Sequence, residues 1–217
     1  MSSTPTSGAI DTLMRRSPLI PVVVIKDWRH AAPMTRALAA GGVPVVEITL
    51  RTDQALDAIR AAAAEAGDAA VGAGTLLSPR DIAAAKAAGA TFGVSPGLTP
   101  TLLQAAKDHD LPLLPGVATA SEIMTGLEHG YDRFKLFPAV PVGGVALLKG
   151  FAGPFPQVKF CPTGGIARDT AMTFLSLDNV LCVGGSWLAP QAAMEAGDWA
   201  AIETIARESV AVASVAA

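Results

Sequence analysis

The chain alternates between short apolar runs and longer alanine-rich stretches. The apolar runs are rich in Val, Ile and Leu and predict strands. We expect eight of them, at 20–25, 43–50, 69–74, 91–95, 111–116, 133–137, 157–162 and 180–185. The stretches between and around them have helical spacing. They predict helices at 53–66, 78–88, 99–109, 119–129 and 168–176, with two more near 7–16 and 198–214. A further helix is expected after the first strand, with Pro33 near its start, where a proline is tolerated.

Several of these helices are bounded by residues that favour helix ends. Ser78 and Thr99 each precede a proline, so each is expected to cap a helix N-terminus. Asp53 and Ser121 are expected to do the same for two other helices. Glycines suited to ending a helix follow four of the helical stretches, at Gly41, Gly67, Gly89 and Gly130.

Strands that alternate with helices form parallel βαβ units. Eight such units are most economically arranged as a single (β/α)8 barrel, of the TIM-barrel α/β class, with an extra helix at the N-terminus. An open, doubly wound sheet is the alternative. No linker, charge block or low-complexity run divides the chain, so we expect one domain over residues 1–217.

Composition supports a compact globular protein. Hydrophobic residues make up 51% of the chain and charged residues 16%, which argues against disorder. The net charge of −3 offers no general attraction for nucleic acid or for an anionic membrane. No apolar run reaches the roughly 20 residues of a membrane-spanning helix, so we expect a cytoplasmic protein. Cys161 and Cys182 lie in apolar runs and are expected to be buried, reduced thiols.

Lys135 is the most informative single residue. In a barrel of this kind the active site lies at the C-terminal ends of the strands. Lys135 interrupts the apolar run RFKLF in the sixth predicted strand. Burial disfavours a charged ammonium, and a neutral amine attacks carbonyl groups. A snorkelling lysine or a buried ion pair with Glu47 is the alternative. Lys159 and Lys26 are rivals, but Lys159 lies well before the end of its strand and Lys26 lies beside a turn.

Glu47 and Arg51 are candidates for acid/base chemistry and for anion binding. Glu47 interrupts the apolar run VPVVEITL, and a carboxylate in such a place can move protons for an enamine mechanism. It could instead be a structural partner for Arg51 or Lys135. Arg51 follows at the strand end, where a guanidinium suits a substrate carboxylate. A surface ion pair with Asp53 would also explain it.

Glycine pairs follow the last two predicted strands. Gly164–Gly165 and Gly184–Gly185, with Ser186 after the second, stand where barrels of this type bind phosphate with backbone N–H groups. Tight turns would explain the same glycines. Thr75 and Thr163 also stand at strand ends, although threonine is common in strands.

Metal and dinucleotide sites are not expected. His30, His109 and His129 all lie on predicted helical stretches, and no HxH, HExxH or paired-cysteine spacing occurs. No GxGxxG motif opens a first helix. We therefore expect no metal and no cofactor.

Taken together, these segments resemble the bacterial 2-dehydro-3-deoxy-6-phosphogluconate aldolases, the class I aldolases of the Entner–Doudoroff pathway, which often also cleave 4-hydroxy-2-oxoglutarate. The resemblance extends from about residue 10 to about residue 210. It is carried by VVEITLRT (45–52), VGAGTLL (71–77), SPGLT (95–99), PLLPGVATASE (112–122), FKLFPA (134–139), GPFPQVKFCPTGGI (153–166), LCVGGSWL (181–188) and EAGDW (195–199).

The resemblance implies a (β/α)8 barrel, a homotrimer and no metal or organic cofactor. It implies that Lys135 forms the Schiff base and that Glu47 is the acid/base. Arg51 and Thr75 would bind the pyruvyl carboxylate, and Thr163 would influence stereochemistry. The remaining implied residues are pocket walls at Pro96 and Phe137 and a phosphate site at Gly164, Gly165, Gly184, Gly185 and Ser186.

The expected reaction yields pyruvate and glyceraldehyde 3-phosphate, and cleavage of 4-hydroxy-2-oxoglutarate yields pyruvate and glyoxylate. An aldolase whose main substrate is unphosphorylated 4-hydroxy-2-oxoglutarate is one alternative, and three others remain at this point. One is the sister aldolase for 2-dehydro-3-deoxy-6-phosphogalactonate. The second is a phosphosugar isomerase using carboxylate chemistry. The third is a non-catalytic barrel that binds phosphosugars, although a binder gains nothing from a buried reactive amine.

Overall fold

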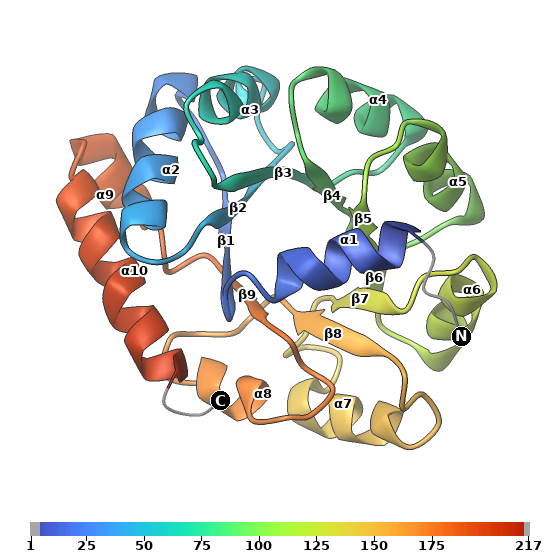
Figure 1. The fold of residues 1–217 in the computed structure, drawn as a ribbon. Coiled ribbons are helices and arrows are strands. Elements are labelled where there is room, and N and C mark those ends of the chain that lie inside the picture. Colours follow the sequence, from blue (N-terminus) through green and yellow to red (C-terminus); the bar gives the residue numbers. More distant parts are fainter. Residues whose placement is uncertain (1–4, 215–217) are drawn as a thin grey trace.

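The computed structural model describes residues 5–214 as an α/β fold whose paired strands all run parallel (Figure 1). Within that range the strands are β1 (Leu19–Val23), β2 (Val45–Thr49), β3 (Ala70–Gly74), β4 (Phe92–Val94), β5 (Leu113–Leu114), β6 (Gly116–Val117), β7 (Arg133–Leu136), β8 (Lys159–Pro162) and β9 (Val183–Gly185). The helices are α1 (Pro5–Met14), the 3-10 helix η1 (Trp28–His30), α2 (Ala31–Ala40), α3 (Ala55–Ala64), α4 (Pro79–Ala87), α5 (Pro100–Asp108), α6 (Ala120–Glu128), α7 (Gly144–Ala152), α8 (Ala171–Leu175), α9 (Gln191–Ala196) and α10 (Trp199–Ser214).

The strands form two parallel sheets. One has the order β5-β4-β3-β2-β1-β9, and the other has the order β6-β7-β8. Single bridges, Phe160 with Val180 and Thr163 with Gly184, join the β8 segment to the β9 segment. The predicted strand 111–116 is divided into β5 and β6 at Pro115. A proline has no N–H to donate to a strand ladder, which accounts for the break.

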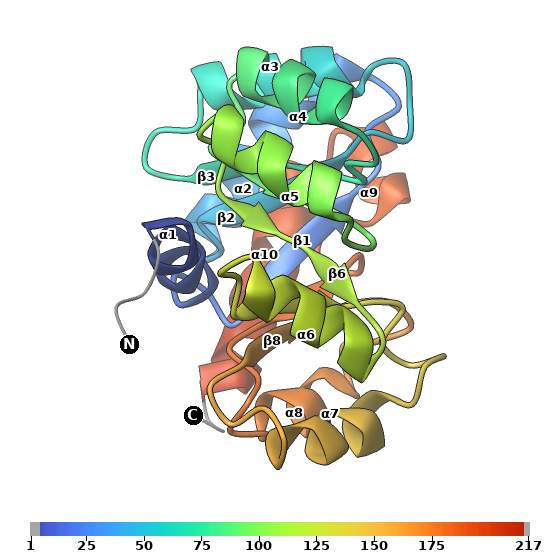
Figure 2. The same cartoon turned by 90° about the vertical axis from the view of Figure 1, so that its right-hand side faces the viewer.

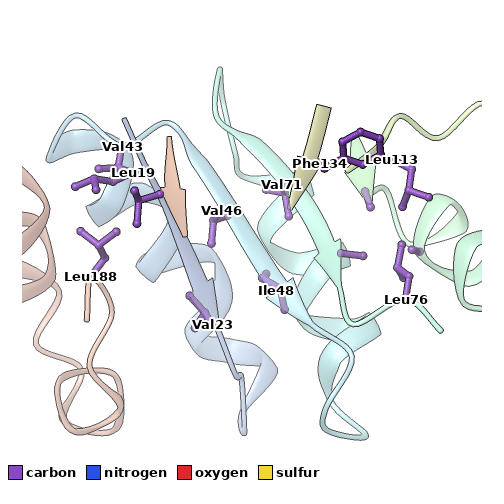
Figure 3. Packing of buried hydrophobic residues seen from close by; sticks show 14 of the residues in the cluster. Leu19, Val23, Val43, Val46, Ile48, Val71, Leu76, Leu113, Phe134 and Leu188 are labelled. Atoms are coloured by element: carbon purple, nitrogen blue, oxygen red, sulfur yellow. The ribbon is translucent and has the colours of Figure 1, made fainter. Parts of the chain in front are cut away.

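The strands have two buried faces because alternate side chains point to opposite sides. The outer face packs against helices that surround the strands in Figure 1. The buried side chains between this face and the helices form a group that we call the outer cluster, and it includes Val46, Ile48 and Val71 (Figure 3). The inner face contributes to a second group, the inner cluster, made of Ile10, Leu13, Met14, Ile20, Val45, Ala70, Phe92, Val94, Leu114, Cys161 and Cys182.

Helix α1 covers the N-terminal ends of the strands. Its residues Ile10, Leu13 and Met14 belong to the inner cluster, so they pack against side chains from the strands. Asp11 accepts a hydrogen bond of 2.6 Å from Nε of Arg133, the first residue of β7. Figures 1 and 2 show α1 lying across one end of the strands. The opposite, C-terminal ends are therefore the ones left available for a site.

The helix starts test the capping predictions. Ser78 and Thr99 each accept a hydrogen bond from the backbone N–H three residues on, as predicted. The predictions for Asp53 and Ser121 were wrong. Helix α3 starts at Ala55 after Gln54, without a side-chain cap. Helix α6 is capped by Thr119, which forms a reciprocal capping box with Glu122.

The pattern did not predict α7 or α9. Helix α7 contains Gly144 and Gly150, which weaken its helical signal, and α9 has only 6 residues. Within residues 5–214, no helix has both the length and the hydropathy needed to cross a membrane.

Candidate functional site

Lys135 and Glu47 meet inside the molecule, across from one another on β7 and β2. The lysine Nζ lies 3.1 Å from Oε1 and 3.3 Å from Oε2 of the carboxylate. Only 4% of Lys135 and 3% of Glu47 are exposed. Lys135 pairs in register with Cys161, and Glu47 lies two residues after Val45, so both share the inner face with the inner cluster. Lys135 is therefore buried, as expected, and the ion pair with Glu47 that the sequence left open as the alternative is also formed.

Gly74, at the end of β3, lies directly against the carboxylate of Glu47. A Cβ atom at residue 74 would lie 2.2 Å from Oε1 of Glu47, far inside normal contact. The backbone of β3 therefore approaches the carboxylate as no larger residue could. The neighbouring strand thereby fixes where the Glu47 carboxylate can lie.

The rival lysines lie elsewhere. Lys159 begins β8 and donates a hydrogen bond to the carbonyl of Asp178 at 2.8 Å. Lys26 is exposed and pairs with Glu195 of α9 at 3.1 Å. All six lysines of the sequence fall within residues 5–214, and Lys135 is the one that is buried. Burial thus distinguishes Lys135 from the other five lysines.

Arg51 is held by Thr75 rather than by a carboxylate. Its Nε donates a hydrogen bond of 3.1 Å to Oγ1 of Thr75. None of the ion pairs among the described residues involves Arg51, so the alternative pairing with Asp53 does not occur. Thr75 has a φ of 62°, a left-handed conformation that is costly for a β-branched residue. Strain of this kind is concentrated at functional sites, and here it accompanies the hydrogen bond that orients the guanidinium.

A cavity of about 180 Å³ lies at the C-terminal ends of the strands, above Lys135. It is lined by Val22, Val24, Arg51, Lys135, Phe137, Thr163, Gly164, Gly165, Ile166, Gly184, Gly185 and Ser186. Most of the predicted site residues therefore share one space. Glu47 and Thr75 are not among the lining residues, but each forms a hydrogen bond with one of them: Glu47 with Lys135, and Thr75 with Arg51. Pro96 is not among the lining residues; its backbone packs against Gly116 of β6.

Three lining residues were missed by the sequence reasoning: Val22, Val24 and Ile166. The signal for the first two was present in the run IPVVVI, where every second residue of a strand faces the same side. The run is apolar throughout, so nothing in it marks the side that faces the site.

The glycine pairs have structural reasons of their own. Gly164 and Gly165 have φ values of 105° and 80°, so they form a turn that favours glycine. A Cβ at Gly184 would lie 2.1 Å from Oγ1 of Thr163, so this strand makes room for the threonine. Among the described residues no hydrogen-bond acceptor is recorded for the amide N–H of Gly165 or of Ser186. The turn and the close approach to Thr163 explain these glycines, and the amides of Gly165 and Ser186 are N–H donors that a ligand could also use.

Phe137 and the two cysteines complete the surroundings of Lys135. The ring centre of Phe137 lies 5.3 Å from Nζ, within the range of a cation–π contact. Both cysteines are free and buried, as predicted. Burial raises the pKa of the Cys182 thiol well above its usual value. This thiol is therefore protonated near neutral pH.

Other features of the described residues do not compete with this cavity. A larger hollow of about 390 Å³ is lined by Lys149, Lys159 and neighbouring residues of α7 and of the segment before β9, and it contains neither Lys135 nor Glu47. No cluster of three or more His, Cys, Asp or Glu side chains suited to a metal ion occurs within residues 5–214.

Comparison with known proteins indicates the family of the chain independently of the site geometry. A family model described as "KDPG and KHG aldolase" matches residues 10–205. The KHG/KDPG aldolase of Escherichia coli K12 is 52% identical over 200 residues, which cover 92% of this chain and 94% of that protein.

Solved structures of aldolases also resemble this chain in fold and in sequence. A KDPG aldolase from Legionella pneumophila, with pyruvate captured as a covalent carbinolamine intermediate, is 44% identical. It superposes with a TM-score of 0.90 over 95% of this chain and 98% of that one. The 2-keto-3-deoxy-6-phosphogluconate aldolase of Zymomonas mobilis ZM4, with 3-phosphoglycerate, is 48% identical. Its TM-score is 0.88 over 93% and 95% of the two chains.

Proposed function

Because the chain belongs to the KDPG and KHG aldolase family, we propose that it cleaves 2-dehydro-3-deoxy-6-phosphogluconate (KDPG) to pyruvate and glyceraldehyde 3-phosphate. In this proposal Lys135 forms the Schiff base. The observation that carries it is the buried pair of Lys135 and Glu47, with Nζ and Oε1 3.1 Å apart, at the floor of the cavity. An amine and a proton acceptor in such contact are what imine chemistry needs. The alternative of a non-catalytic binding protein is set aside, because the relatives are aldolases.

Imine formation begins with proton transfer. Glu47 is close enough to accept a proton from the Lys135 ammonium, and this leaves a neutral amine. The amine attacks the C2 ketone of KDPG to give a carbinolamine. Loss of water then gives a protonated imine, which is an electron sink. The carbinolamine captured in the Legionella pneumophila aldolase supports the same sequence of steps here.

Carbon–carbon cleavage follows from the imine. Glu47, directly or through water, removes the proton of the C4 hydroxyl, and the C3–C4 bond breaks. Its electron pair moves into the imine to form an enamine, and glyceraldehyde 3-phosphate leaves. A proton returns to C3 of the enamine, and hydrolysis releases pyruvate and restores Lys135. One carboxylate can serve each of these proton transfers because it alternates between its two protonation states.

The other lining residues bind and orient the substrate. Arg51, oriented by Thr75, would bind the pyruvyl carboxylate with its remaining N–H donors. Phe137 would form a wall beside the imine, with Pro96 further out, and Thr163 would face the C4 hydroxyl. The amides of Gly164, Gly165, Gly184, Gly185 and Ser186, with the Ser186 hydroxyl, would bind the phosphate. This mechanism requires no metal or cofactor.

The same site would cleave 4-hydroxy-2-oxoglutarate (KHG) to pyruvate and glyoxylate. The name of the Escherichia coli relative, KHG/KDPG aldolase, supports this second activity. KHG shares the 2-oxo acid end of KDPG and differs at the end that leaves as the aldehyde. The Lys135 chemistry would therefore be common to both substrates.

We also propose the architecture and setting in which the site works. A single, closed (β/α)8 barrel is supported by the pairing of β9 with β1 and by the bridges from the β8 segment to the β9 segment. A homotrimer in the cytoplasm is supported by the family resemblance.

A borohydride trap tests the proposed function. Incubation with pyruvate and sodium borohydride should add one reduced pyruvyl group to Lys135, located by peptide mass spectrometry. An adduct on Lys159 or Lys26 would contradict the assignment of the nucleophile. A folded sample without any adduct would contradict the Schiff-base mechanism. A kcat/KM for KDPG greater than that for its galactonate epimer would then separate the proposed substrate from that of the sister aldolase.

Replacement of Gly74 by alanine should reduce KDPG cleavage by about 10²-fold, since displacement of a reacting group by about 1 Å has that effect. The added Cβ would overlap Oε1 of Glu47 and drive the carboxylate from its place beside Lys135. Steady-state kinetics measure the effect, and circular dichroism establishes that the variant folds. Gly150→Ala is the matched control, because nothing lies within 4 Å of the added Cβ there. Equal activity in the two variants would contradict the role given to Gly74.

A further inference from the structure

Val22 lies beside Glu47 on the neighbouring strand. The two residues are partners in the parallel register of β1 and β2. Residues paired in this way point their side chains to the same face of a sheet, and Glu47 points to the inner face. Ile20, two residues before Val22, belongs to the inner cluster, and Val24, two residues after it, lines the cavity. These three residues therefore form one row that rises along β1 from the buried interior to the opening.

The chemistry at Lys135 locates the reacting carbons at the level of Val22. The C2 atom of the substrate is bonded to Nζ in the imine, and C3 is one bond further. Glu47 must approach C3 to return a proton to it, and Glu47 is already 3.1 Å from Nζ. The side chain that flanks Glu47 on β1 is Val22, which also lines the cavity. The C3 atom thus meets a carboxylate on one strand and an apolar side chain on the next.

The other apolar lining residues are less well placed to contact C3. Phe137 stands on the same segment as Lys135, with its ring centre 5.3 Å from Nζ. Val24 stands two residues nearer the opening, which is about 6.6 Å further along an extended strand. Ile166 follows the glycine turn after β8. Val22 is the one that shares the level of the Glu47 carboxylate.

We propose that Val22 sets the size of the substituent that C3 of the 2-oxo acid donor can carry. Pyruvate, with hydrogen atoms alone on C3, fits against the valine, whereas the additional methyl group of 2-oxobutanoate overlaps it. Val22 is then a specificity-determining residue for the donor. This inference rests on the proposed Schiff base at Lys135, and it goes beyond it by naming the residue that selects the 2-oxo acid.

Proton exchange at C3 isolates the donor half of the reaction. In the imine, Glu47 removes a proton from C3 to form the enamine, and a deuteron from heavy water returns to the same carbon. One C–H bond is broken and one C–D bond is formed, and hydrolysis releases the deuterated 2-oxo acid. No aldehyde takes part. The exchange rates of pyruvate and 2-oxobutanoate, followed by proton NMR, therefore report only how each donor fits.

The variant Val22→Ala should raise the ratio of 2-oxobutanoate exchange to pyruvate exchange by about 10-fold or more, since one methylene group in an apolar pocket changes discrimination by about 10–200-fold. Val22→Ile should lower the same ratio, and it keeps the inference testable if the alanine variant does not fold. Val24→Ala serves as the positional comparison and should change the ratio less than Val22→Ala does. The exposed Val212 provides a matched control, and Val212→Ala should leave the ratio at the wild-type value.

The outcomes separate this inference from the function on which it rests. If the wild-type protein exchanges pyruvate but Val22→Ala leaves the ratio unchanged, Val22 does not select the donor. An equal rise in the Val22 and Val24 alanine variants would also overturn the proposal, because it would reflect cavity size in general. If the wild-type protein neither exchanges pyruvate nor forms an adduct on Lys135, the Schiff-base function itself fails.

Discussion

Replacement of Lys135 by arginine should reduce the rate of KDPG cleavage by at least about 10⁴-fold, in keeping with the loss of a covalent nucleophile. A guanidinium stays protonated in proteins and does not attack a ketone. Arginine nevertheless keeps a cation opposite the buried Glu47 carboxylate. The variant should therefore fold but form no adduct with pyruvate and borohydride. Steady-state kinetics and intact-protein mass spectrometry give the two readouts.

The choice of arginine matters because of the buried partner. Lys135→Ala would leave the Glu47 carboxylate unpaired, which typically destabilises a protein by about 3–5 kcal/mol. Lys159→Arg is the matched control, because Lys159 lies at the start of β8 and is more exposed. That variant should retain wild-type turnover and trapping. Substantial cleavage by Lys135→Arg would show that another group is the nucleophile.

The variant Glu47→Gln should turn over about 10²–10⁴-fold more slowly while still forming a trapped pyruvyl adduct on Lys135. Glutamine has nearly the same shape as glutamate, so it preserves packing against Gly74. It cannot carry the proton that must move between the C4 hydroxyl and C3. Steady-state kinetics would show the loss of turnover, and borohydride trapping would show that the imine still forms.

Glu195→Gln is the control for a carboxylate beside a lysine, because Glu195 pairs with Lys26 on the surface. It should leave both turnover and trapping unchanged. Loss of trapping together with turnover in a folded Glu47→Gln variant would mean that Glu47 is also required for imine formation. Unaltered turnover would remove Glu47 from the mechanism.

The alternation of strands and helices could be predicted from the sequence because each element carries its own local signal. The strands are apolar runs of Val, Ile and Leu, and Ser78 and Thr99 cap helices through hydrogen bonds within four residues of chain. Pro115 limited the prediction of the fifth strand, because a missing N–H interrupts a ladder without changing the apolar pattern. Thr119 was missed because Ser121 offers a similar hydroxyl nearby.

The site was predictable where a charge interrupts an apolar run. Lys135 and Glu47 each stand alone among apolar neighbours, and burial of a charge requires a partner. Val22 could not be found in this way, because a valine in a run of valines carries no mark of which face it occupies. Nor could the sequence reveal that the backbone of Thr75 is left-handed, or that the Thr75 hydroxyl accepts a hydrogen bond from Arg51. Those facts depend on register and on loop geometry, which arise from tertiary structure.

The buried ion pair also has a consequence for protein engineering. Two charges removed from water recover only part of their lost hydration from each other, and well-packed apolar residues in such positions are often equally stable or more stable. Selection of variants for heat resistance alone would therefore favour replacement of Lys135 and Glu47, and the survivors would be robust but inert. A thermostable form of this protein must be selected for turnover at the same time.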